Sequence, residues 1–297
     1  MIVKNDPYEC KQEIFMSGTL YLCATPIGNL EDITFRVLRI LKEADLIAAE
    51  DTRNSIKLLN HFDIHTPMTS YHEFNKIDKG RYLVGQLLEG KNIALITDAG
   101  TPGISDPGEE LCAMCHEEGI PVTSVPGPAA CITALTMSGL PTRRFAFEAF
   151  LPADKKERRL ILEELKDETR TIVIYEAPHR LVRTLEELRE ALGSRQISLC
   201  RELTKKHETC MRTTLDDLIA YYRDNKPLGE CVLVIEGKSR EEIRKEESES
   251  WEEISIEKHV EMYEKQGYAR KEAMKMAAKD RGVTKRDIYQ HFLGGKG

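Results

Sequence analysis

The sequence predicts an α/β protein of two domains with a cleft between them, followed by a small C-terminal helical module. Three observations predict this fold class. Strand-like apolar runs alternate with helical patterns, which is typical of a mainly parallel sheet covered by helices. Polar, glycine-rich loops follow several of these runs, and the charge changes sign near the C-terminus. With 297 residues and 41% apolar composition, the chain is long enough to form two cores.

The first predicted domain covers residues 18–140, after a polar extension at residues 1–17 in which Met16 is an alternative start. Short buried strands are expected at residues 20–24, 46–49, 93–96 and 122–125. Helices are expected near residues 33–42, 52–62 and 79–88, after Asp106, and after Gly127. This alternation predicts a mainly parallel sheet.

The second predicted domain covers residues 141–238 and mixes its elements less regularly. Strands are expected at residues 144–150, 171–175, 197–201, 208–213 and 231–236. Helices are expected at residues 155–166 and 180–192. Because the connection to the first domain is short, we expect the two domains to form a cleft.

The last part of the sequence predicts an acidic linker and a basic helical module. Residues 239–254 hold three basic residues against seven glutamates, whereas residues 255–297 hold ten basic against six acidic residues. Three helical patterns, at residues 255–265, 270–281 and 284–293, are separated by Gly267 and Gly282. The last two fit a helix-turn-helix. Nucleic-acid contact and a stabilising or oligomerisation role both remain open for this module.

Composition limits the function classes. The formal charge of −7 argues against uniform coating of nucleic acid but allows a local basic face. Neither a membrane-length apolar run nor a secretory segment is visible, so we expect a cytoplasmic protein. Cys112 and Cys115 form a CxxC without the second half of a zinc motif, so we expect no metal site. Four other cysteines fall in apolar stretches typical of buried thiols: Cys23, Cys131, Cys200 and Cys231.

The loop at residues 97–108 is the strongest candidate for a ligand site. Glycines and prolines prevent regular structure after the strand at 93–96 and let the backbone approach a bound molecule. Asp98, Thr101, Ser105 and Asp106 offer carboxylates and hydroxyls suited to ribose or ammonium groups. The usual phosphate-binding motifs are absent. A plain turn before a helix is the alternative interpretation.

Two more loops, at residues 25–29 and 125–130, follow strands of the same predicted sheet. Because the carboxyl ends of parallel strands share one edge, we expect these loops and residues 97–108 to converge on one crevice. In the loop at 49–53, the structural interpretation is that Asp51 caps a helix and Arg53 forms a surface ion pair. Polar loops also follow strands in the second half, at residues 175–180 and 201–208.

Six motifs, in order, resemble the S-adenosylmethionine-dependent tetrapyrrole methylase superfamily: TPIGNLEDIT, AEDTR, DAGTPGISDPG, VPGPAA, YEAPHR and RELTKKHE. Within it, they are similar to the ribosomal RNA small subunit methyltransferase I branch. The resemblance covers about residues 18–237, and the C-terminal helices resemble the small extension of that branch. Ala129 stands where serine is frequent, which leaves Ser124 as the nearer hydroxyl.

The resemblance implies two α/β domains of tetrapyrrole-methylase type, S-adenosyl-L-methionine bound in the cleft between them, and a homodimer. The implied reaction is 2′-O-ribose methylation of a cytidine in the decoding region of the small ribosomal subunit (16S) rRNA. The implied donor-binding residues are Pro26, Gly28, Asp98, Ala99, Gly100, Ile104, Ser105, Ser124, Ala129, Ala130, Tyr175 and Leu203.

A ribose hydroxyl is a weak nucleophile, so a general base would assist the reaction. We take His179, Glu50 and Glu176 as the foremost catalytic candidates, and Asp51, Glu202 and Glu208 stay open. The candidates for binding RNA phosphates are the basic residues of the polar loops: Arg53, Arg180, Arg201, Lys205 and Lys206.

Two other functions remain as alternatives. One is methylation of a small tetrapyrrole-like metabolite, and the basic loops of the second half count against it. The other is a non-catalytic S-adenosylmethionine-sensing module that binds nucleic acid. The YEAPHR and RELTKKHE loops, which donor binding alone would not need, count against a non-catalytic module.

Overall fold

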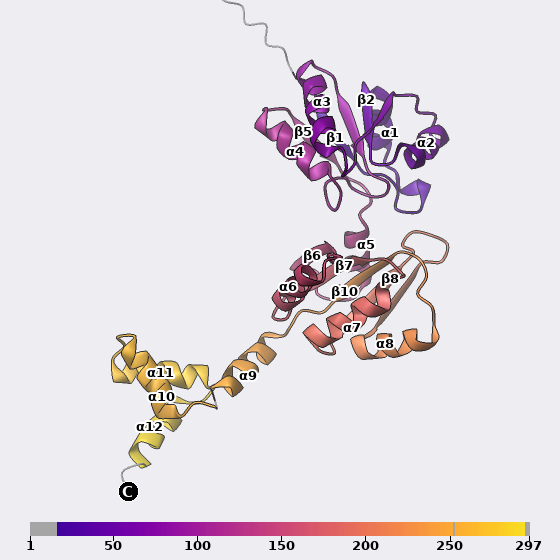
Figure 1. The fold of residues 1–297 in the computed structure, drawn as a ribbon. Helices are drawn as coiled ribbons and strands as arrows, with labels where there is room; N and C mark the ends of the chain where they lie inside the picture. Colours follow the sequence, from indigo (N-terminus) through magenta and orange to yellow (C-terminus); the bar gives the residue numbers. More distant parts are fainter. Residues whose placement is uncertain (1–16, 252, 295–297) are drawn as a thin grey trace, which may run out of the picture.

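The computed structural model describes residues 17–251 and 253–294, so the predicted alternative start at Met16 and nearly all of the N-terminal extension lie outside the described residues. Two five-stranded sheets and their helices form two units joined through a short connection, and a helical part follows (Figure 1). This arrangement confirms the predicted fold class.

The first sheet has the strand order β3-β2-β4-β1-β5, and its four strand pairs are parallel. Its strands are β1 (Leu20–Cys23), β2 (Leu46–Ala49), β3 (Met68–Ser70), β4 (Ile93–Ile96) and β5 (Val122–Val125). The sequence did not predict β3, because its three half-buried residues form no apolar run. The four longer strands lie where the apolar runs predict them.

Helices cover both faces of the first sheet. They are α1 (Phe35–Glu43), α2 (Thr52–His61), α3 (Lys76–Leu88) and α4 (Gly108–Glu117). On one face, Leu83 and Leu111 of α3 and α4 pack with Leu95, and on the other Leu41 and Leu59 of α1 and α2 pack around Ile96 and its neighbours. With both faces covered, the strands are apolar throughout, as parallel strands usually are.

Helix α5 (Ala130–Met137) follows β5 in the chain but packs against the second sheet, where it contacts β7 and β10 (Figure 1). Its buried residues Cys131, Ala134 and Leu135 share one apolar cluster with Val173 and Val234 of those strands. The predicted boundary at residue 140 assigns α5 to the first domain, and that boundary stays a prediction. In packing, α5 joins the two units.

The second sheet has the order β6-β7-β10-β8-β9. Only β6 and β7 are parallel, and the other pairs are antiparallel. The strands are β6 (Phe145–Phe150), β7 (Thr171–Glu176), β8 (Gln196–Arg201), β9 (Thr209–Thr214) and β10 (Cys231–Ile235). This mixed sheet explains why the alternation of elements is less regular in the second half of the sequence.

Successive side chains of β7 and β10 point to opposite faces of the second sheet, so the core of the second unit has two parts. Ile172, Ile174 and Leu233 face the helices α6 (Lys155–Leu165), α7 (Leu181–Leu192) and α8 (Leu215–Asp224). Val173 and Val234 point to the other face and contact α5. Helix α8 was not predicted. Its N-cap Thr214 accepts a hydrogen bond from the Asp217 amide, which is a start signal present in the sequence.

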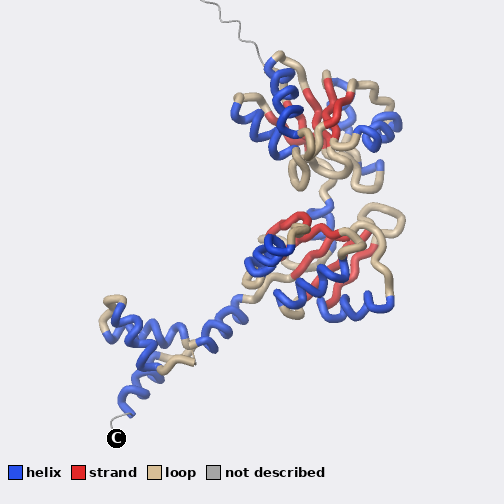
Figure 2. The backbone as a smooth tube through the Cα atoms, in the orientation of Figure 1, coloured by secondary structure: helices blue, strands red, loops and turns tan. Residues whose placement is uncertain are grey.

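Helices joined by short loops make up the described chain after β10, and no strand is found there (Figure 2). They are α9 (Arg240–Ser250), α10 (Ile256–Lys265), α11 (Arg270–Asp280) and α12 (Lys285–Gly294). Most of the predicted linker at 239–254 is therefore helical, and Ser239 and Glu242 form a capping box at its start. Helices α10 to α12 share a small core around Val260, Ala277 and Ile288.

The buried His259 ties α9 to the last helices. The Trp251 ring stacks on the imidazole, with centroids 3.8 Å apart. His259 Nε2 lies 3.2 Å from Asp280 Oδ2, and Arg281 Nε donates to Nδ1 at 3.1 Å. Burial and the Arg281 charge lower the pKa of His259 below its usual value.

Acidification should destabilise this helical part. Since the pKa of His259 is lower in the folded state, the unfolded state binds more protons once the pH falls below about 6.5, and stability is lost in that direction. Urea unfolding at pH 7.5 and 5.5 can follow the fluorescence of Trp251, the one tryptophan of the chain. A His259→Phe variant keeps a stacked ring without titrating. An equal pH dependence in both proteins would contradict this account.

Candidate functional site

Three loops of the first unit meet at the carboxyl edge of its sheet. The backbones of Thr25 and Gly100 exchange hydrogen bonds of 2.9 and 3.0 Å. Thr25 Oγ1 donates to the Thr97 carbonyl at 3.2 Å, and Thr101 Oγ1 donates to the Pro128 carbonyl at 2.9 Å. The predicted convergence of residues 25–29, 97–108 and 125–130 is confirmed.

Two features give the loop after β4 its shape. Gly100 has φ +87°, and a Cβ there would lie 3.3 Å from a methyl carbon of Ile27, so the position suits glycine. The Asp106 carboxylate accepts hydrogen bonds from the amides of Gly103, at 2.8 Å, and Gly108, at 2.9 Å. These bonds hold the loop against the start of α4.

A cavity of about 390 Å³ lies between this edge and the second unit. The second unit contributes the end of β7, the loop after β8 and the start of β10. Nine of the twelve predicted donor-binding residues line the cavity: Asp98, Ala99, Gly100, Ile104, Ser105, Ala129, Ala130, Tyr175 and Leu203. Residues from both predicted domains therefore meet at one place.

The other three predicted donor residues lie outside this cavity. Pro26 and Gly28 line an adjoining hollow of about 340 Å³ that shares Asp98. Gly28 has φ +152°, and a Cβ there would lie 2.5 Å from Lys205 Cγ, so the glycine lets the loop after β1 touch the second unit. Ser124 belongs to β5 and is not among the cavity-lining residues within the described chain.

Three carboxylates of the first unit line the cavity, those of Glu50, Asp98 and Asp106. Glu50 Oε2 accepts hydrogen bonds from Thr97 Oγ1, at 2.5 Å, and from the Asp98 amide, at 3.4 Å. Glu50 thereby fixes the residues that follow β4. The exposed Asp98 carboxylate accepts from Asn54 Nδ2 at 3.2 Å and can still contact a ligand.

Glu176, at the end of β7, is buried and fully engaged. Its carboxylate accepts from the Ala177 amide at 2.7 Å, from Arg180 Nε at 2.8 Å and from Thr184 Oγ1 at 2.5 Å. Thr184 accepts in turn from the buried Arg158, at 2.7 Å. This network holds the cavity wall formed by Ala177 and Pro178.

His179 lies on the same loop but is exposed and does not line the cavity within the described chain. Of the three foremost catalytic candidates, the structure therefore brings Glu50 and Glu176 to the cavity. Their roles stay predictions.

Tyr175 connects the second sheet to α5. Its hydroxyl oxygen accepts a hydrogen bond from the Cys131 amide at 3.0 Å. Its ring makes edge contacts with Phe147 and Phe150, with centroids 5.0 and 5.6 Å apart. Burial raises the pKa of Tyr175, so the phenol stays neutral and positions the cavity wall.

Asp51 and Arg53 interact as the structural interpretation of the sequence predicts. Asp51 caps α2, and its carboxylate forms an ion pair with Arg53 at 2.7 Å. The Arg53 hydrogen bonds lower the pKa of Asp51 to about 2. The Arg53 side chain is nevertheless 89% exposed, so a ligand can reach it.

Partners also hold three of the four predicted basic residues of the second unit. Arg201 Nε donates to the Leu228 carbonyl at 2.8 Å, and Arg180 binds Glu176. Lys205 binds Glu230 at 2.9 Å and Glu202 at 3.2 Å. Partial burial opposes a high pKa for Lys205, but these carboxylates outweigh it and raise the pKa. Lys206 is exposed and has no ion pair with the described residues.

Four cavity-lining residues of the second unit lie outside the loops that the sequence singled out: Phe150, Glu230, Cys231 and Val232. Three of them lie at or beside the start of β10, which is antiparallel to β7 and β8. The start of an antiparallel strand shares an edge with the carboxyl ends of its neighbours, but the sequence does not reveal strand direction. No sequence signal identified Phe150.

The family model described as Tetrapyrrole (Corrin/Porphyrin) Methylases matches residues 19–219. Over 275 residues, the chain is 54% identical to ribosomal RNA small subunit methyltransferase I of Halalkalibacterium halodurans, covering 93% of this chain and 94% of the relative. The protein of the same name from Bacillus subtilis is 47% identical, with the same coverage.

Solved structures share the fold at low sequence identity. A diphthine synthase aligns with a TM-score of 0.56 and 14% identity, over 74% of this chain and 90% of its own. The uroporphyrin-III-C-methyltransferase of Thermus thermophilus aligns with a TM-score of 0.53 and 21% identity, over 73% of this chain and 94% of its own. These likenesses concern the fold alone.

Within residues 17–251 and 253–294, no three or more His, Cys, Asp or Glu side chains are grouped so as to hold a metal ion. In the same ranges, none of the helices has the length and apolar character needed to span a bilayer.

Removing the Thr184 hydroxyl should destabilise the second unit. Thr184→Val keeps the shape but leaves Glu176 and Arg158 each without one buried hydrogen bond, at a cost of about 1–3 kcal/mol in the free energy of unfolding. Urea unfolding followed by circular dichroism measures this loss. Thr184→Ser keeps the hydroxyl and serves as the control. Equal stability of the Val and Ser variants would show that the network is unimportant.

Proposed function

The chain belongs to the tetrapyrrole methylase family, and on this premise we propose that it is an S-adenosylmethionine-dependent methyltransferase of small-subunit ribosomal RNA. The acceptor we propose is the 2′-hydroxyl of a cytidine in the decoding region. The observation that carries the proposal is the cavity between the two units, whose walls hold residues from the six ordered motifs.

Methyltransferases of this family generally use S-adenosylmethionine, and the residues present suit it. A cavity of about 390 Å³ lies in the size range of small-ligand sites. The Asp98 carboxylate can accept hydrogen bonds from an ammonium group or from ribose hydroxyls. Apolar lining for a purine ring comes from Ala99, Ile104 and Leu203. When bound, the donor supplies an electrophilic methyl group on its sulfonium.

The protein's part in such a transfer is alignment and the exclusion of water. The loops joined at Thr25, Gly100 and Pro128 fix one wall of the cavity, and the Glu176 network fixes the other. Both walls rest on hydrogen bonds within the chain, so the site is largely formed before any ligand binds.

For the general base we favour Glu50 among the three candidates. Glu50 lines the cavity, and its hydrogen bonds come from a hydroxyl and an amide rather than from a cation. Glu50 Oε1, the atom that would take the proton from the acceptor hydroxyl, has no hydrogen bond with the described residues. Glu176 is committed to Arg180 and Thr184, so we assign it to positioning the loop that carries His179.

The partners we propose are ribosomal RNA and a second copy of the protein. Because the net charge is −7, contacts with rRNA phosphates must be local, and Arg53, Arg180, Arg201, Lys205 and Lys206 remain our candidates. We also infer a homodimer and a cytoplasmic location, as the family resemblance implies.

One experiment tests the function. The protein and labelled S-adenosylmethionine are incubated with small ribosomal subunits that lack the modification, with naked rRNA, and with a precorrin-type tetrapyrrole. We expect label on ribosomal RNA, at the 2′-oxygen of one cytidine. Label only on the tetrapyrrole would refute the RNA function, and no transfer at all would favour a non-catalytic binding module.

Substitution of Asp98 should weaken donor binding. Losing a hydrogen bond to a charged group costs about 1.5–3 kcal/mol, so Asp98→Ala should raise the Kd for S-adenosylmethionine roughly tenfold to a hundredfold in calorimetry. Asp78→Ala removes a carboxylate that is 97% exposed on α3 and serves as the matched control. An unchanged Kd for Asp98→Ala would remove Asp98 from the site.

A further inference from the structure

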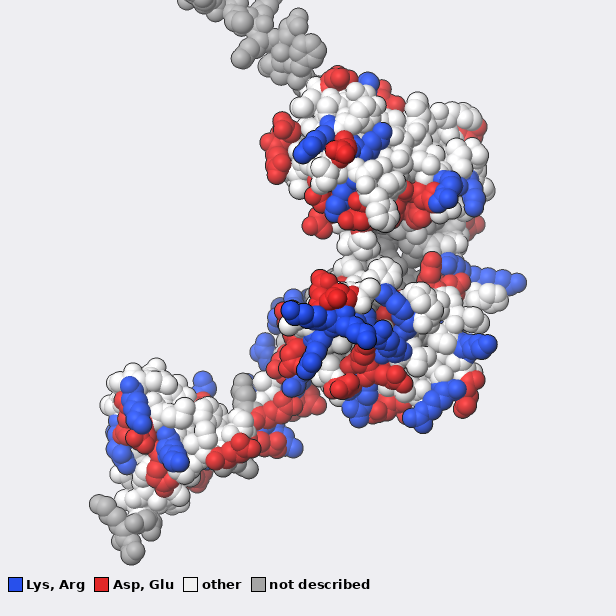
Figure 3. All heavy atoms as spheres, in the orientation of Figure 1, with Lys and Arg blue, Asp and Glu red and all other residues white. Residues whose placement is uncertain are grey.

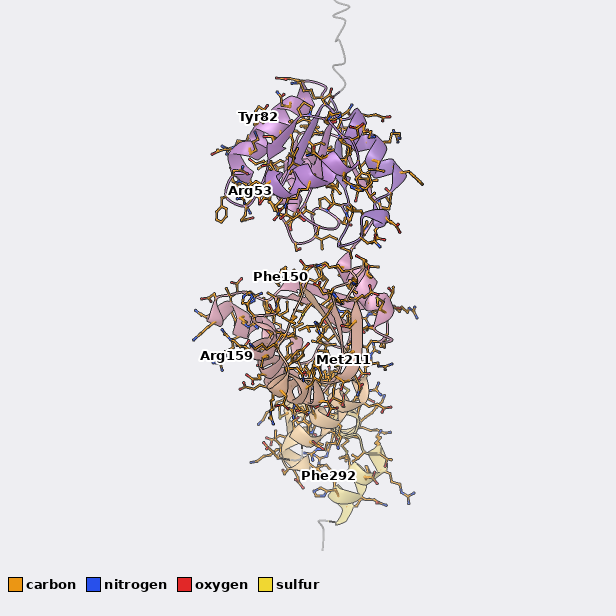
Figure 4. All side chains as sticks on the ribbon, turned by 90° about the vertical axis from the view of Figure 1, so that its right-hand side faces the viewer. Arg53, Tyr82, Phe150, Arg159, Met211 and Phe292 are labelled. Atoms are coloured by element: carbon orange, nitrogen blue, oxygen red, sulfur yellow. The ribbon has the colours of Figure 1, made fainter. Side chains whose placement is uncertain are left out.

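Phe150 is an exposed aromatic residue at the edge of the cavity that donor binding, as proposed above, does not use. It ends β6, lines the cavity and is 50% exposed. Figure 4 places it at the edge of the second unit that faces the first. Since burying a large aromatic ring is favourable, a half-exposed ring at a cavity mouth marks a surface on which a partner can pack.

The backbone is distorted where Phe150 meets the cavity. Phe147 pairs with Val173 and Phe150 pairs with Tyr175, so three steps along β6 match two along β7. Ala149 adopts φ +48°, which costs a residue other than glycine about 1–3 kcal/mol. The extra residue brings Phe150 to the face that carries Phe147, and both rings contact Tyr175. Bulges of this kind redirect side chains beside active sites.

One cation lies over the Phe150 ring, and others follow Phe150 in the chain, alongside the carboxylates of Asp154 and Glu157. The Arg180 guanidinium lies over the ring, 5.9 Å from its centroid, and Glu176 holds that arginine in place. Beyond a short loop, Lys155, Lys156 and Arg159 of α6 are exposed and form no ion pair with the described residues. Lys155 and Lys156 occupy the first turn of α6, where the helix dipole disfavours cations. Figure 3 shows Lys and Arg side chains gathered over this side of the second unit, and Figure 4 labels Arg159 there.

A flat apolar ring flanked by cations matches a nucleotide in an RNA strand. The base can stack on the ring, and the cations can bind phosphates. The donor fits these surroundings less well, because it has no phosphate and carries a positive sulfonium. For a 2′-hydroxyl to enter the cavity between the two units, its nucleotide must leave the stacked helix, which exposes the base.

We propose that Phe150 is the platform on which the base of the acceptor nucleotide stacks, while Lys155, Lys156 and Arg159 bind phosphates of the adjoining RNA. This inference rests on the proposed function and adds the residue that positions the acceptor. The strained Ala149 and the bulge in β6 then hold the ring at the cavity mouth.

The test is steady-state methylation of unmodified small ribosomal subunits. For Phe150→Ala we expect kcat/KM for the subunits to fall about fivefold to a hundredfold, because base–aromatic stacking contributes about 1–3 kcal/mol. The calorimetric Kd for S-adenosylmethionine should not change. Phe150→Tyr keeps a stacking ring and should restore activity, whereas Phe150→Leu keeps apolar bulk and the fold but should stay impaired.

Phe74→Ala is the matched control, because Phe74 is 97% exposed and lies outside the cavity lining in the described chain. It should leave both quantities unchanged. A weaker Kd for the donor with unchanged RNA parameters would assign the ring to the donor and overturn the proposal. Full activity of both Phe150→Ala and Phe150→Leu would overturn it as well. If the unsubstituted protein methylates no RNA, the proposed function fails, which is a distinguishable result.

Discussion

The packing of α5 against the second sheet is the interaction on which the cavity depends. The helix follows the loop after β5, and its first turn hydrogen-bonds to Tyr175. Its apolar cluster also includes Ile27 from the first unit and Leu203 from the second. Because Leu203 and Ile27 line the cavity as well, the contact that joins the units also sets the distance between the cavity walls.

Polar interactions then divide the acidic residues of the cavity into two groups. Glu176 is buried and shared among an amide, an arginine and a threonine, so it fixes a wall. Asp98 is exposed and has one side-chain amide as its partner, so it can bind a ligand. Buried carboxylates need such compensation, because an unpaired charge away from water is costly. The environment of each residue, and not its type, separates structural from binding roles.

Much of the fold could be predicted because its signals are local. Buried strands appear in the sequence as apolar runs. Helix starts appear as capping residues such as Thr34 and Asp154, whose side chains cap the helices that follow them. The prediction failed where local signals were weak or ambiguous. Strand β3 is too short to show a pattern, and α8 contains aromatic residues that suit strands equally well. The charge pattern of residues 239–254 predicts a linker, but the structure has a helix there. A capping box begins this helix, and Ser248 donates a hydrogen bond to the Arg281 carbonyl.

The sequence by itself determined the family, the parallel first sheet and the loops that meet at its edge. It could do so because motif residues and strand ends are local, and parallel strands place their carboxyl ends together. Only the tertiary structure decided which residues line the cavity. It left Ser124 outside, committed Glu176 to Thr184, and turned Phe150 toward the cavity mouth. These outcomes depend on strand direction, a bulge and hydrogen bonds between distant residues, and no local pattern in the chain encodes them.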